Sequence, residues 1–244
     1  MHGTTQGSVE KALAGEYELS FSETLKSAWS GTEGVKLTFI GSLFVYLVIL
    51  MIATAVFSMI LGVNLQEQEG GGGSIIAQVG VDLLTMPIAM PMMVALMMMG
   101  IRHVNNRPVQ ISNLFDYYVV VWPLVFLSIA IYLCVVAGFL LLILPGIYLS
   151  VAYAFAYPLM VDKKMGIWEA METSRKAVTA HWFAIFGILL GVSLITLVSA
   201  IPLGIGLIWT LPMGYIVYGI LYTTIFGFSD EMETETTAES DGDW

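Results

Sequence analysis

Charged residues are scarce in this sequence, and their scarcity argues against a soluble fold. They make up 11% of its 244 residues, whereas roughly 25% is usual for a soluble domain. The deficit falls in long apolar runs, which indicates a polytopic membrane protein rather than a large soluble core. Residues 1–20 also lack the apolar centre of a cleavable signal peptide, so we expect the first span to direct membrane insertion.

Cysteine pairs and the common catalytic motifs are also missing. The single cysteine, Cys134, lies inside an apolar run, which excludes an internal disulfide and a CxxC metal site. His103 and His181 are far apart, without the spacing of metal ligands. We find no HExxH motif, phosphate-binding glycine loop or paired carboxylates. We therefore expect no enzymatic activity, no cofactor and no metal.

Six apolar runs predict an all-α membrane protein with six transmembrane helices, arranged as three units of a short amphipathic helix and a helical hairpin. The predicted spans are residues 37–63, 75–101, 119–142, 146–161, 182–201 and 207–228. Spans three and four require a tight turn, which we place at Leu144-Pro145-Gly146. The fourth span is then short, so either the bilayer thins locally or the span begins before the proline.

The spans form one predicted membrane domain, residues 17–228, between two polar ends. We expect residues 1–16 to be flexible. Residues 229–244 hold seven of the nineteen acidic residues and show no apolar periodicity, which predicts a disordered acidic tail. Such a tail disfavours nucleic acid as a partner; it is either simply solvated or docks a basic partner.

Two charged segments have the spacing of amphipathic helices. Residues 17–30 place apolar side chains at near-helical intervals, with Ser22 suited to cap the helix. Residues 166–178 form the second segment, directly before span five. Each segment either lies in the membrane interface or packs on the neighbouring span.

Lysine and arginine are absent from three of the loops between the spans. All nine fall on one side: Lys11, Lys26, Lys36, Arg102, Arg107, Lys163, Lys164, Arg175 and Lys176. The positive-inside rule places that side in the cytoplasm. An even number of spans independently puts both termini on the same side, so we expect both to be cytoplasmic.

Weak internal similarity suggests a repeat. An offset of 146 residues aligns Glu23 with Glu169 and Gly41 with Gly187, and an offset of 56 aligns Ile111 with Ile167. One interpretation is a pseudo-threefold arrangement of parallel units about an axis along the membrane normal. The other is chance matching, because apolar sequences align easily with one another.

The stretch LPGIYL…PLMVDKKMGIWEAMETSRKAVTAHWFAIFGI resembles a pattern in uncharacterised bacterial inner-membrane families. These families are related to the membrane domain attached to some glycerophosphodiester phosphodiesterases. The similar residues are Pro145-Gly146, Val161-Asp162, Trp168-Glu169-Ala170, Ser174-Arg175, Gly100-Ile101-Arg102, Arg107-Pro108-Val109 and Leu114-Phe115. The resemblance implies a six-span inner-membrane protein without assigned chemistry. It brings no phosphodiesterase activity, because no such domain is present here, and Lys163-Lys164 stands where those families often have an acid.

Span two holds the most unusual intramembrane residues. Asp82 is the one acid well inside a predicted span, where a charge is costly and usually faces water or the bundle interior. Pro87 and Pro91 lie one turn apart and would kink the helix. These three residues are our candidate intramembrane polar site for a proton or cation. The alternative is that span two begins near Val81 and Asp82 caps it at the interface.

Two further groups are candidates for contacts. Lys163, Lys164, Arg175 and Lys176 could bind anionic lipid headgroups, or could serve topology alone. Gly187 and Gly191 form a small-xxx-small pattern that predicts helix packing.

Together these features favour a non-enzymatic membrane protein that organises or regulates membrane components. A small transporter or channel using span two is the first alternative, and a lipid-modifying enzyme is the second. The expected partners are the lipid bilayer, anionic headgroups, and a second copy of the chain or another membrane protein.

Overall fold

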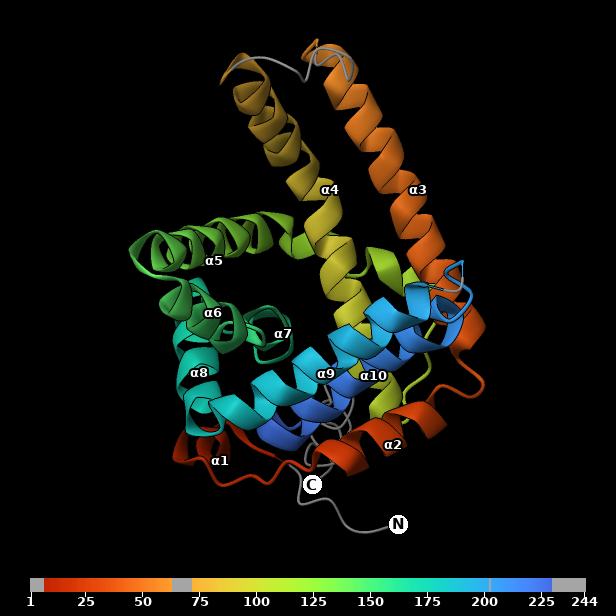
Figure 1. Ribbon diagram of the computed structural model, residues 1–244, viewed down its shortest axis with the longest axis vertical. Coiled ribbons are helices and arrows are strands. Elements are labelled where there is room, and N and C mark those ends of the chain that lie inside the picture. Colours follow the sequence, from red (N-terminus) through yellow and green to blue (C-terminus); the bar gives the residue numbers. More distant parts are fainter. Residues whose placement is uncertain (1–6, 63–71, 202, 230–244) are drawn as a thin grey trace, which may run out of the picture.

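The computed structural model describes residues 7–62, 72–201 and 203–229, and these residues form helices without any strand (Figure 1). Six helical segments in this part of the chain are long and apolar enough to cross a membrane, which confirms the predicted fold class. The elements are α1 (Val9–Ala14), α2 (Phe21–Gly31), α3 (Lys36–Ile60), α4 (Gly72–Val104), η1 (Ile111–Phe115), η2 (Tyr118–Val120), α5 (Val121–Leu141), α6 (Ile143–Ala152), α7 (Ala156–Asp162), α8 (Ile167–Ala180), α9 (Trp182–Ala200) and α10 (Leu207–Phe226).

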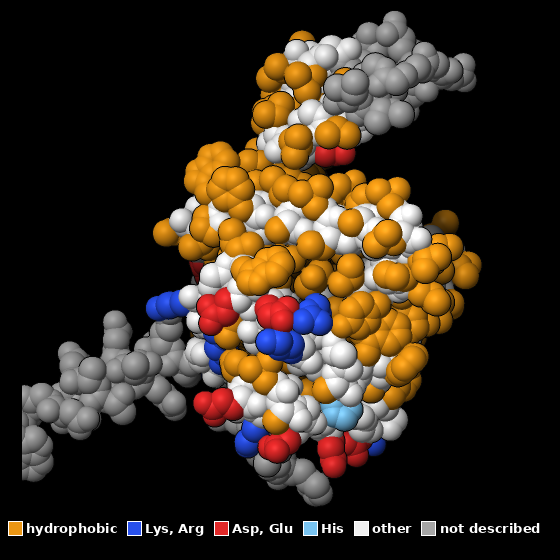
Figure 2. Space-filling view, turned by 90° about the vertical axis from the view of Figure 1, so that its left-hand side faces the viewer, with side chains coloured by type: hydrophobic (Ala, Val, Ile, Leu, Met, Phe, Trp, Pro, Cys, Tyr) orange, Lys and Arg blue, Asp and Glu red, His pale blue; other side chains and the backbone are white. Residues whose placement is uncertain are grey.

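Three helical hairpins diverge from one packed end of the molecule. The hairpins are α3–α4, α5–α6 and α9–α10, and Figure 1 shows α3 and α4 extending away from the other two. Helices α1, α2 and α8 lie where the hairpins converge. Most charged side chains gather over this half of the surface in Figure 2, which we call the charged end, while the remainder is mainly apolar.

Burial separates the spans into inner and outer helices. In an apolar 18-residue stretch of α4, 61% of the residues are buried inside the protein. The corresponding shares in α3 and α9 are only 6% and 11%. Apart from Lys36, helices α3, α5 and α9 contain no charged side chain, and the large side chains that they expose are mostly apolar, so their exposed faces suit lipid rather than water. At 1.5 Å per residue, the 21 residues of α5 measure about 31 Å, close to the thickness of a hydrocarbon core.

The turn between spans three and four lies earlier than we predicted. Helix α5 ends at Leu141 and α6 begins at Ile143, so Leu142 alone joins them and Pro145 lies in the first turn of α6. Proline is tolerated there because the first amide groups of a helix have no intrahelical acceptor. The fourth span therefore begins before the proline, which was one of our two alternatives.

Residues 9–14, which lie inside the segment predicted to be flexible, form the helix α1. The Ser8 side chain accepts a hydrogen bond from the Lys11 amide, and Gly15 closes the helix in the left-handed conformation. Beyond it, the Tyr17 hydroxyl donates to the Ala177 carbonyl of α8 over 2.7 Å. Burial raises the pKa of Tyr17 to about 12. These contacts fix the segment on α8, a non-local partner that the sequence alone did not reveal.

Other predicted boundaries need smaller adjustments. Helix α2 begins at Phe21 with Ser20 at its N-cap position, so Ser22 does not cap it. Residues 1–6, the glycine-rich 63–71, Pro202 and the acidic tail from 230 onward lie outside the described residues.

The three units interlock in a repeating order. The entry helix α2 packs on α9 and α10, η1 packs on α3 and α4, and α8 packs on α5 and α6, so each entry element contacts the hairpin of another unit. A Cβ added at Gly191 would come 2.7 Å from the Phe21 ring, and one at Gly41 would come 3.0 Å from Ile111. Phe21, Ile111 and Ile167 occupy equivalent positions in the register found above. This order supports the pseudo-threefold interpretation.

Helices α4 and α10 cross with their backbones in direct contact. A Cβ added at Gly219 would collide with the Gly100 carbonyl, and one added at Gly100 would collide with the Tyr215 carbonyl. Glycine is therefore required at both positions, because no side chain fits between the two helices. Residues of α4 around this crossing, including Met99 and Ile101, are fully buried.

This crossing predicts opposite effects for two alanine substitutions. We expect Gly219→Ala to lower the free energy of unfolding by about 1–3 kcal/mol through overpacking. Gly187→Ala is the control, because a Cβ there meets open space, and alanine in a helix interior is favoured over glycine by about 0.5–1 kcal/mol. Unfolding of both variants in mixed detergent, followed by tryptophan fluorescence, tests this; equal stability would contradict the crossing.

Candidate functional site: a charged cavity that continues into an apolar groove

A built-in break divides the fourth span. Helix α6 ends at Ala152 and α7 begins at Ala156. The Ser174 hydroxyl donates to the Ala152 carbonyl over 2.7 Å and accepts from the Phe155 amide over 3.2 Å. The Tyr218 hydroxyl donates to the Ala154 carbonyl over 2.6 Å. Non-helical backbone at membrane depth requires such partners, because lipid offers none.

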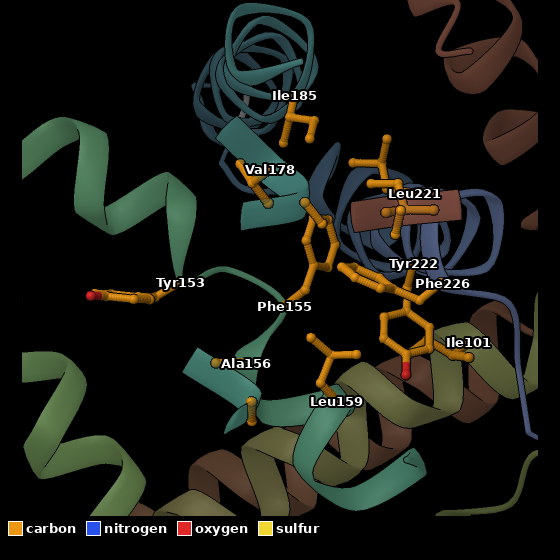
Figure 3. Packing of buried hydrophobic residues seen from close by; sticks show 14 of the residues in the cluster. Ile101, Tyr153, Phe155, Ala156, Leu159, Val178, Ile185, Leu221, Tyr222 and Phe226 are labelled. Carbon is orange, nitrogen blue, oxygen red and sulfur yellow. The ribbon is translucent and has the colours of Figure 1, made fainter. Parts of the chain in front are cut away.

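An aromatic cluster fills the space beside the break. Phe155 is fully buried, and Figure 3 shows its ring between Val178 on one side and Tyr222 and Phe226 on the other. The ring centroids of Phe155 and Phe226 lie 5.8 Å apart, and those of Tyr222 and Phe226 lie 5.4 Å apart. The cluster therefore packs the break before α7 against α10.

Asp162, the last residue of α7, binds Tyr222 of α10 and Ser229, which follows that helix. Its Oδ2 accepts from the Tyr222 hydroxyl over 2.7 Å, and its Oδ1 accepts from the Ser229 amide over 3.2 Å. Lys163 Nζ lies 3.3 Å from the same carboxylate and donates to the Ser229 hydroxyl over 2.8 Å. A carboxylate whose side chain is 2% exposed needs these partners to remain buried.

A cavity of about 580 Å³, which we call the polar cavity, lies beside Asp162. Its walls come from the end of α4, the loop to η1, the end of α7 and the residues after α10. Arg102, Arg107, Asp116, Asp162 and Ser229 supply its charged and polar surface. Arg102 Nη1 lies 2.7 Å from Asp116 Oδ2, and its guanidinium lies over the ring of Tyr117.

A second cavity of about 830 Å³, the apolar groove, adjoins the first. Most of its surface is hydrocarbon, from Val119, Val120, Pro123, Phe126, Met160 and Ile167, and Lys164 adds one cation. Asp116, Tyr117 and Val161 line both cavities, so the groove continues into the polar cavity. Together they form an elongated space that is charged at one end and apolar at the other.

Asp82, Pro87 and Pro91 lie apart from this space. Helix α4 begins at Gly72, so Asp82 lies inside the helix and does not cap it, contrary to our alternative interpretation. Its carboxylate is exposed and accepts a hydrogen bond from Gln78 over 3.0 Å. Both prolines are accommodated within the continuous helix α4. None of the three lines either cavity.

The four cations predicted to bind headgroups do not form one cluster. Lys163 points to Asp162, and Lys164 lines the apolar groove. Arg175 and Lys176 lie on α8, where both pair with Glu172, at 2.8 Å and 3.4 Å. The hydrogen bonds from Arg175 lower the pKa of the Glu172 carboxyl, and the same bonds raise the pKa of Arg175. Of the four, Lys164 lines the site and Lys163 lies beside it through its ion pair with Asp162, whereas Arg175 and Lys176 lie outside it.

Of the two glycines predicted to pack helices together, only one lies against a neighbouring side chain. Gly191 lies against the Phe21 ring of α2, whereas a Cβ at Gly187 would meet nothing within 4 Å. The closest helix contacts instead involve Gly100 and Gly219, whose partners are far away in the sequence. Among the described residues, no group of three His, Cys, Asp or Glu side chains could hold a metal ion.

The chain was compared with protein-family models, curated proteins and solved structures. No protein-family model, curated protein or solved structure matches the chain. The site must therefore be interpreted from its own geometry.

The break in span four predicts a cost for losing one hydroxyl group. Ser174→Ala would leave the buried Phe155 amide and Ala152 carbonyl without their partner, at about 1–3 kcal/mol for each unsatisfied group. Ser193→Ala is the matched control, since Ser193 is exposed on α9 and bonds only within its own helix. Detergent unfolding should show a clear loss for the first and a change within about 0.5 kcal/mol for the second; equal stability would contradict the role of Ser174.

Proposed function

We propose that the protein is a non-enzymatic component of a bacterial inner membrane that organises the lipids around it. In this proposal the charged end and both termini face the cytoplasm. The placement of all nine Lys and Arg residues on one side of the spans supports that orientation. The resemblance of residues 144–188 to uncharacterised bacterial inner-membrane families supports the location.

The observation that carries the proposal is the contrast between a closed interior and an open apolar surface. At the α4–α10 crossing the backbones touch, and Phe155, Tyr222 and Phe226 fill the space beside it. By contrast, few of the apolar side chains of α3 and α9 are fully buried, and about half of them are exposed. A protein built in this way acts on the surrounding bilayer more readily than on a solute passing through it.

Lysine and arginine side chains at the charged end favour anionic lipids as the lipids that the protein attracts. Arg102 lies in the last turn of α4 and Arg107 follows that helix, Lys163 and Lys164 follow α7, and all four lie close to the ends of membrane spans. Lys and Arg near the cytoplasmic surface attract anionic headgroups by about 1 kcal/mol each.

Transport through span two has weaker support. Asp82 is exposed beside Gln78, away from the two cavities. A lipid-modifying reaction would need titratable groups poised for proton transfer, whereas Asp116 and Asp162 are both held in ion pairs with neighbouring cations.

Reconstituted vesicles provide the test. With purified protein in vesicles of mixed phosphatidylglycerol and phosphatidylcholine, energy transfer from protein tryptophan should be stronger to a dansyl-labelled phosphatidylglycerol than to the labelled phosphatidylcholine. High salt should weaken the difference, because it screens charges at the surface. Equal transfer to both probes would contradict the gathering of anionic lipid.

The same vesicles test the alternative. Proton and cation flux should equal that of protein-free vesicles, and Asp82→Asn should change nothing. A protein-dependent flux that Asp82→Asn abolishes would overturn the proposal in favour of transport.

A further inference from the structure

The three joints between the units differ in how completely they are closed. In the first, the Phe21 ring covers Gly191 of α9, and in the second, Ile111 covers Gly41 of α3. The equivalent residue of the third joint, Ile167, instead lines the apolar groove opposite residues of α5. We call this joint, between the second and third units, the open joint, because a cavity of about 830 Å³ adjoins its equivalent residue. Phe21 and Ile111 are themselves 49% and 42% exposed on their outer sides.

The open joint lies beside an exposed apolar surface of a membrane span. Val119 and Phe126, which line it, are 93% and 57% exposed, and both belong to a segment that qualifies as a membrane span. Such a surface offers water no hydrogen bonds, whereas an acyl chain could enter the groove from the side without leaving the hydrocarbon of the bilayer. The groove therefore has the shape and the surface for an alkyl chain.

The other end of the space suits an anion. The walls of the polar cavity and the apolar groove together carry three cations, Arg102, Arg107 and Lys164, and two carboxylates, Asp116 and Asp162. Lys163, which is paired with Asp162, adds a further positive charge beside the cavity. The local charge is therefore positive, although the charged end as a whole also carries many acids. Guanidinium groups are well suited to phosphate oxygens because their donors form a planar fork.

We propose that this space binds one molecule of an anionic phospholipid. One acyl chain lies in the apolar groove between α5 and Ile167, and the phosphate lies where the two spaces meet, between Arg107 of the polar cavity and Lys164 of the groove. The inference rests on the proposed function and sharpens it, because it turns a general preference for anionic lipid into one defined site. The bound lipid then covers Ile167 and lies between the second and third units.

Native mass spectrometry of the full chain provides the test. The protein is extracted from membranes containing equal amounts of phosphatidylglycerol and phosphatidylcholine. Wild type should retain one phosphatidylglycerol in preference to phosphatidylcholine. Ile167→Trp fills the groove and should reduce retention of both lipids about tenfold, whereas Ile201→Trp, at an exposed position directly after α9 and outside both cavities, should not.

A second pair of variants tests the headgroup end. Lys164→Gln should reduce retention of phosphatidylglycerol about tenfold, as expected when one charge-assisted contact is lost, and leave phosphatidylcholine unchanged. Lys176→Gln removes a cation that binds Glu172 outside the two cavities, so it should have no effect. Circular dichroism should show that all four variants remain folded.

Three further results would count against the proposed lipid site. Displacement of the lipid by an equal concentration of glycerol phosphate would overturn it, because the ligand would then be a soluble phosphate. Unchanged retention in Ile167→Trp would overturn it as well. If tryptophan energy transfer still favours phosphatidylglycerol while no lipid is retained, the site is wrong and the proposed function stands; if that preference is also absent, both fail.

Discussion

Direct backbone contact between α4 and α10 is the constraint on which the arrangement depends. Gly100 and Gly219 leave no room for a side chain, so the first and third hairpins meet at a fixed depth. Aromatic residues of α10 can then reach across to α7, where Tyr218 and Tyr222 bind the broken fourth span and Asp162. A close crossing of two helices thus positions α7, and α7 in turn supplies a wall to both cavities.

Around that crossing the three units form an unequal ring. The equivalent residues differ in their surroundings: Phe21 lies against Gly191, Ile111 lies against Gly41, and Ile167 lines the apolar groove. A repeat of this kind provides a natural route to a binding site, because one joint can open while the other two keep the units together. The charged residues at the inner end of the open joint then determine which headgroup fits.

The span positions could be predicted from the sequence, but the contacts between spans could not. Span five was predicted as residues 182–201 and α9 covers Trp182–Ala200, since a long apolar run has few alternatives in a bilayer. The break at Tyr153–Phe155 escaped prediction because its partners, Ser174 and Tyr218, are distant in the sequence. Gly187 and Gly191 form a short sequence motif, whereas Gly100 and Gly219 follow none, so the sequence alone did not indicate their contact.

A structure of the protein in a nanodisc containing phosphatidylglycerol tests the lipid site most directly. We expect density for one acyl chain beside Ile167 and Phe126, continuous with a headgroup near Arg107 and Lys164. A groove closed by direct packing of Ile167 on α5, with no density between them, would contradict the site.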